Sequence, residues 1–177
     1  DEKKIVYEHI NKDIVEPVIK NALAEIYQLS TKTDDRVSTA LNKVLSSADP
    51  EEIERDIWVT ETAQDGAIWL AKLHQQLSQK PLYVSLWQLG DPASMEEMTF
   101  ANELRMNTSE KVQFVYIHVV KTDSKRQRDL WKQYIVKHDI KGIHLYLTLN
   151  QSLQLASLLN TYEIPSFALV RANGRVP

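Results

Sequence analysis

The chain has 177 residues, of which 43% are hydrophobic and 25% charged, a balance typical of a globular protein with its own core. Its formal net charge of -3 gives no general attraction to nucleic acid or to an anionic membrane, so neither is expected as a partner. There is no cysteine, which excludes disulfides, zinc–thiolate sites and thiol nucleophiles within these residues. No apolar run is long enough to span a membrane.

The first part of the chain, residues 1–79, is expected to form a separate helical region. Its first helix is predicted to bend or end at Pro17, and the polar stretch 30–35 is predicted to be a break. The apolar residues of that helix are Ile5, Ile10, Ile14, Val18, Ile19, Ala22, Ile26 and Leu29. A second short apolar face is formed by Val37, Leu41, Val44 and Leu45. The segment 49–52, Asp-Pro-Glu-Glu, predicts a third helix start, and 65–79 a fourth helix.

From residue 80 the pattern changes to strands that alternate with helices. Strands are expected at 82–87, 112–120, 143–149 and 164–170, and helices at 94–106, 125–138 and 152–162. Asn173-Gly174 is a turn signal because both residues tolerate positive φ. This alternation predicts an α/β domain over 80–177, with helices on both faces of the sheet.

Three segments of this domain carry a resemblance to a known family. The strand 82–87 ends in Trp87 and leads into Asp91-Pro92-Ala93-Ser94 at a helix start. The later segments 162–167, Tyr-Glu-Ile-Pro-Ser-Phe, and 170–175, Val-Arg-Ala-Asn-Gly-Arg, complete the pattern. Together they resemble the thioredoxin-like family, most closely its TlpA/ResA-type thiol-disulfide oxidoreductase branch. The resemblance implies a thioredoxin-like sheet that is truncated at its C-terminus, because the family has a further strand and helix after the turn.

The resemblance places the family's Cys-x-x-Cys motif at Asp91-Pro92-Ala93-Ser94, where no sulfur is present. Disulfide exchange therefore has no attacking thiolate, and neither a catalytic residue nor a cofactor is expected. Asp91 followed by Pro92 is instead a favourable helix start, with the carboxylate as N-cap. Asp91 and Ser94 without a clear base would make a poor nucleophilic pair.

A peptide groove is the second implication of the resemblance. The proline that matches Pro165 is cis in the family and faces the cysteine motif. The groove would then be formed by Trp87, Ile164, Pro165 and Ser166 opposite the helix start at 91–93, and would bind an extended peptide by strand addition. The alternative is that Pro165 only supports the turn into its strand.

Neither the histidines nor the basic residues of the chain predict a metal site or a nucleic-acid site. The five histidines, His9, His74, His118, His138 and His144, form no metal-binding spacing, so no metal is expected. The basic stretch 121–128 lacks interleaved aromatic residues and is interpreted as a solvated helix start.

Three functional hypotheses remain open. The first is a redox-inactive, non-enzymatic module that binds or scaffolds a protein or peptide. The second is a thiol-disulfide oxidoreductase relative that acts with cysteines outside these residues or in a partner. In the third, the helical region carries the function. An unpaired sheet edge would also allow a homodimer. The resemblance implies a periplasmic or other extracytoplasmic bacterial location, and a cytoplasmic one stays open.

Overall fold

The structure is a computed structural model and describes residues 2–43, 45, 49–61, 64–78, 80–108 and 111–176. Its helices are α1 (Glu2–Asp13), α2 (Pro17–Leu41), α3 (Gly66–Gln76), α4 (Pro92–Thr108), α5 (Lys125–Lys137) and α6 (Leu149–Leu159). Its strands are β1 (Glu51–Glu54), β2 (Ile57–Glu61), β3 (Leu82–Trp87), β4 (Gln113–Val120), β5 (Gly142–Thr148) and β6 (Ser166–Val170).

The strands form one sheet in the order β1-β2-β5-β4-β3-β6. The four inner strands β2, β5, β4 and β3 run parallel, and the outer strands β1 and β6 pair antiparallel with β2 and β3. Parallel strands linked by helices are covered on both faces, which explains why β3 and β4 are almost continuously apolar. The predicted α/β class is confirmed.

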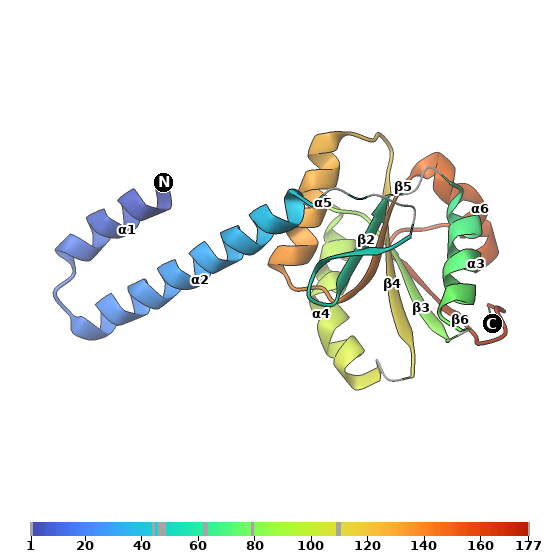
Figure 1. Cartoon of the computed structure of the whole chain (residues 1–177), viewed down its shortest axis with the longest axis horizontal. Helices are drawn as coiled ribbons and strands as arrows, with labels where there is room; N and C mark the ends of the chain where they lie inside the picture. Colours follow the sequence, from blue (N-terminus) through green and yellow to red (C-terminus); the bar gives the residue numbers. More distant parts are fainter. Residues whose placement is uncertain are drawn as a thin grey trace.

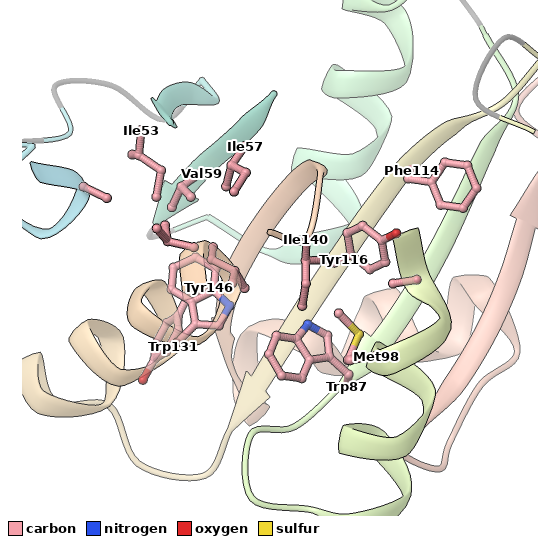
Figure 2. Close-up of a cluster of buried hydrophobic side chains, with 14 of the residues drawn as sticks. Ile53, Ile57, Val59, Trp87, Met98, Phe114, Tyr116, Trp131, Ile140 and Tyr146 are labelled. Carbon is pink, nitrogen blue, oxygen red and sulfur yellow. The ribbon is translucent and has the colours of Figure 1, made fainter. Parts of the chain in front are cut away.

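Helices cover both faces of this sheet (Figure 1). Side chains of α2, α4 and α5 pack on one face, and those of α3 and α6 on the other. Figure 2 shows Trp87, Met98 and Trp131 within the first of these two clusters. The C-terminal end of β3, which leads into α4, is therefore held between two packed layers.

The prediction of helix alone over 1–79 is wrong between residues 51 and 61. The helix start expected at 49–52 is instead followed by the hairpin of β1 and β2. Ile57 and Val59 are buried while Trp58 between them is 40% exposed, a strand pattern of period two. β2 pairs with β5, so the sheet extends across the proposed boundary at residue 79. Gln79 itself lies outside the described residues.

The predicted break at 30–35 is also wrong, because α2 continues to Leu41. The hydroxyls of Thr31 and Thr33 donate to the carbonyls of Tyr27 and Leu29, at 3.0 and 2.9 Å, so these polar side chains are accommodated within the helix. The break lies earlier: α1 ends at Asp13 and α2 begins at Pro17. Proline is well suited to the first position of a helix, because its fixed φ is helical and no N–H is needed there. Val44, expected on the second apolar face, lies outside the described residues.

The helices α1 and α2 form an arm that projects from the sheet domain (Figure 1). Arg36 fixes the base of the arm by donating from Nε and Nη2 to Glu54, at 2.6 and 2.8 Å. It also donates to Asp139 Oδ1 at 3.0 Å. Val37 and Ala40 of α2 are buried against the domain, so the end of α2 belongs to the core.

Gly142 begins β5 with a φ of +142°, which L side chains rarely adopt. A Cβ there would lie 2.9 Å from Tyr116 Cε2 and 3.1 Å from the Phe114 carbonyl oxygen. Gly142→Ala is therefore expected to lower the free energy of unfolding by about 2–4 kcal/mol, from backbone strain plus overpacking.

Urea denaturation of Gly142→Ala beside Gly90→Ala would test this. Gly90 also has a positive φ, of +86°, but nothing lies within 4 Å of its Cβ position. The Gly90 variant is expected to lose only about 1 kcal/mol, from the backbone alone. Equal losses in the two variants would contradict the close contacts at Gly142.

Candidate functional site

The start of α4 is built around Asp91 and Ser94, the positions at which the resemblance places the family's cysteines. The Ser94 backbone N–H donates to Asp91 Oδ2 at 2.8 Å, so Asp91 is the predicted N-cap. Because the ionised carboxylate accepts hydrogen bonds from the backbone and side chain of Ser94, the pKa of Asp91 is held below its usual value. This arrangement stabilises the carboxylate rather than preparing it for proton transfer.

Ser94 is fully buried, and its side chain holds the preceding loop in place. Its Oγ accepts a hydrogen bond from the Gln88 N–H at 3.2 Å. A covered hydroxyl with a structural partner is not a nucleophile that a substrate can reach. Pro92 and Ala93 are the exposed residues of this helix start.

His118 on β4 holds the same loop from the other side. Its Nε2 accepts from the Leu89 N–H at 3.0 Å, which leaves the proton of the neutral ring on Nδ1. Burial lowers the pKa of His118 to about 3, so the ring stays neutral under ordinary conditions. The sequence favoured a histidine with a satisfied hydrogen bond over a metal ligand at His118, and the structure confirms the first of these. Its position on a predicted buried strand was the available signal for a structural role.

Trp87 does not face the surface where a peptide would lie. Its side chain is fully buried, with its ring edge-on to His118 at 4.9 Å between centroids. It also contacts the Tyr134 ring at 5.7 Å. A side chain with no exposed surface cannot contact a bound peptide, so Trp87 is left out of the groove considered below.

The other groove residues lie at the same end of the sheet as the start of α4. Ser166 pairs with Leu86, next to Trp87 at the end of β3. The Ile164–Pro165 bond is cis, as expected, and leads directly into β6. A helix that starts straight after an inner strand, beside a proline-led antiparallel strand, is the arrangement that the resemblance predicts. The chain has a thioredoxin-like fold.

The end of this thioredoxin-like sheet is an open edge among the described residues. β6 pairs with β3 on one side, and no described strand pairs with its other side. After β6 the chain turns, with the Gly174 N–H donating to the Arg171 carbonyl at 2.8 Å. The turn predicted at Asn173-Gly174 is confirmed, since Gly174 has a φ of +77°.

A cavity of about 470 Å³ lies beside the loop that His118 holds. Gln88, Leu89 and Gly90 line it from the loop, and Lys121 and Thr122 from the segment after β4. Sequence reasoning did not find this cavity, because the two segments are brought together only by the pairing of β3 with β4.

Neither a metal cluster nor a membrane-spanning helix is present in the described part of the chain. No group of three or more His, Asp or Glu side chains there is placed to hold a metal ion. None of the helices there combines the length and apolar character needed to cross a bilayer. In the basic stretch 121–128, Arg128 is paired with Asp123 and, at 3.1 Å, with Glu61.

No protein-family model matches the chain, and no curated protein is detectably similar to it. Among solved structures, a Bacteroides vulgatus protein described as a thiol-disulfide oxidoreductase is 20% identical with a TM-score of 0.48, over 77% of this chain and 79% of that one. A thiol:disulfide interchange protein from Chlorobium tepidum TLS is 16% identical with a TM-score of 0.47, over 59% and 70%. A DsbF homologue from Corynebacterium diphtheriae is 15% identical with a TM-score of 0.48, over 58% and 63%. At these sequence identities and TM-scores, the likeness carries no argument about the activity of this chain.

Proposed function

We propose that this chain is a redox-inactive thioredoxin-like module that binds a protein or peptide. One observation carries the proposal: the helix start that would hold the reactive sulfurs is instead closed by hydrogen bonds of Asp91 and Ser94, in a chain with no cysteine. Thiol-disulfide exchange would need sulfurs from outside these residues. When capping residues replace the reactive sulfurs of a redox fold, the fold and its binding surface can remain, but disulfide exchange is lost.

The surface next to this helix start suits an extended peptide. Pro92 and Ala93 are exposed, and Ile164, Pro165 and Ser166 are partly exposed. No hydrogen bond within the described residues joins the backbone of Ile164 to another group. Backbone N–H and C=O groups without a partner are those that an added strand would pair with. The proposed groove therefore consists of Pro92, Ala93, Ile164, Pro165 and Ser166.

Three variants, each with one exposed alanine changed to arginine, test where a partner binds. Ala93→Arg places a bulky cation in the groove, Ala22→Arg places it on the helical arm, and Ala71→Arg on α3 is the matched control on the other face of the sheet. A charged change at Ser166 is less suitable, because its Oγ is buried and the change would disturb folding.

The measurement is a crosslinking pull-down from native extract, repeated by titration once a partner is identified. Ala93→Arg is expected to weaken binding at least tenfold, while Ala71→Arg binds as the unchanged chain does and all three variants melt alike. Loss in Ala22→Arg alone would assign the function to the arm instead. Reductase activity in the purified chain would contradict the proposal outright.

We also propose membership of the TlpA/ResA-type branch and an extracytoplasmic location. Both rest on the resemblance of the segments around Asp91 and Pro165, and neither changes the chemistry argued above. Fractionation of cells that carry the natural gene, with the chain recovered outside the cytoplasm, is the expected result. Recovery only with cytoplasmic markers would reject the location.

A further inference from the structure

The helical arm exposes more apolar surface than any other part of the described chain. Its exposed large apolar side chains are Ile5, Val6, Ile10, Val15, Val18, Ile19, Ile26 and Leu29. Ile26 and Leu29 are each 64% exposed although they lie in the middle of a long helix. At roughly 100 Å² for each side chain, the five of these on α2 or just before it, Val15, Val18, Ile19, Ile26 and Leu29, offer about 500 Å². Two copies would then bury about 1,000 Å², the smallest area expected of a specific interface.

Four of the residues on α2 form a regular seam. Ile19, Ala22, Ile26 and Leu29 follow one another at spacings of three, four and three, which is the core pattern of paired helices. We call these four residues the α2 seam. No charged residue interrupts it, so another helix could cover it without burying an unpaired charge.

The helix α1 covers a different face of α2 from the seam. Its Tyr7 ring stacks on Tyr27 with 4.5 Å between centroids, and Lys3 Nζ donates to Ser30 Oγ at 2.8 Å. Lys3 also pairs with Asp34. The arm is therefore a helical hairpin (Figure 1). The contacts between its two helices leave the residues of the α2 seam exposed.

The domain limits how a helix can lie on the seam. The same face of α2 continues into Val37 and Ala40, which the domain covers. A parallel copy of the arm would bring a second domain to the same place, so the two domains would collide. An antiparallel copy puts its domain beyond the free end of the first arm, where nothing obstructs it.

The seam is self-complementary in that antiparallel arrangement. Ile19 of one copy faces Leu29 of the other, and Ala22 faces Ile26, so a two-fold axis brings all four residues into apolar layers. Each small residue thereby faces a large one, which favours close packing. The same register places Glu25 beside Glu25 of the second copy, on the rim next to the axis.

We propose that the α2 seam pairs antiparallel with the α2 seam of a second copy of this chain, forming a two-fold dimer through the arms. The inference does not rest on the proposed function, because it uses a different surface.

Sedimentation equilibrium of the full chain over roughly 1–200 µM tests the inference. The unchanged chain, of 20.4 kDa, is expected to approach twice its mass at the upper end of this range. Ile26→Asp is expected to remain a monomer. The matched control is Leu153→Asp on α6, at a similarly exposed position (59%), which should dimerise as before.

A substitution of Glu25, at the rim of the seam, tests whether the two α2 helices pair antiparallel. Glu25→Gln removes a like-charge contact in the antiparallel register and is expected to tighten the dimer about threefold. An unchanged dissociation constant for Glu25→Gln would overturn the antiparallel register. A monomer at all concentrations would overturn the dimer, and a dimer kept by Ile26→Asp would place the contact elsewhere, such as the open edge of β6.

Discussion

The double variant Asp91→Cys/Ser94→Cys is expected to acquire thiol-disulfide activity that the natural chain lacks. Asp91 is the N-cap of α4 and Ser94 lies three residues later, hydrogen-bonded to it through the backbone. One helical turn brings the two Cα atoms within the range that a disulfide spans. The N-terminus of α4 would stabilise a thiolate at position 91, as its N–H groups now stabilise the Asp91 carboxylate.

Two measurements check this prediction. The variant should reduce insulin in the presence of dithiothreitol while the natural chain does not, and thiolate absorbance should give a pKa below the ordinary ~8.5 for the first sulfur. The single variant Asp91→Cys is the control, because it offers the activated thiol without a second sulfur to close the disulfide. An inactive double variant with an ordinary thiol pKa would show that the surroundings of the helix start no longer support this chemistry.

The second large effect is a loss of stability in mild acid. His118 and His144 are buried, and burial lowers their pKa values to about 3 and about 4, so both are neutral in the folded chain. Near pH 6.5 and below, the unfolded chain takes up protons at these rings and the folded chain does not. Stability is therefore full above pH 6.5 and falls as the pH is lowered towards 4, by about 2 kcal/mol for each ring at pH 5.

Urea unfolding at pH 7.5, 6 and 5 would measure this loss, expected to total about 4 kcal/mol at pH 5. In His118→Gln the amide oxygen could still accept from the Leu89 N–H, so the fold should be retained while about half of the pH dependence disappears. A variant with the full pH dependence of the natural chain would show that His118 does not contribute to it.

Several features followed from local sequence alone. The strand at 82–87 was predicted with the bounds that β3 has, because an unbroken apolar run between turn residues leaves little choice. Asp91 was predicted as an N-cap from its side chain and the proline after it, and the structure confirms the hydrogen bond to Ser94. The absence of redox sulfurs follows from the sequence directly, since no tertiary arrangement can supply a missing thiolate.

Tertiary structure decided what depends on distant partners. The segment 49–52 has the local chemistry of a helix start, yet 51–61 forms strands because β2 pairs with β5, far along the chain. The pairing of β3 with β4 buries Trp87 against His118 and brings the loop after β3 to the cavity after β4. Short-range spacing and capping determine where a segment begins and what backbone it prefers. Only the packed sheet decides which side chains are covered, and that determines which surfaces remain for a partner.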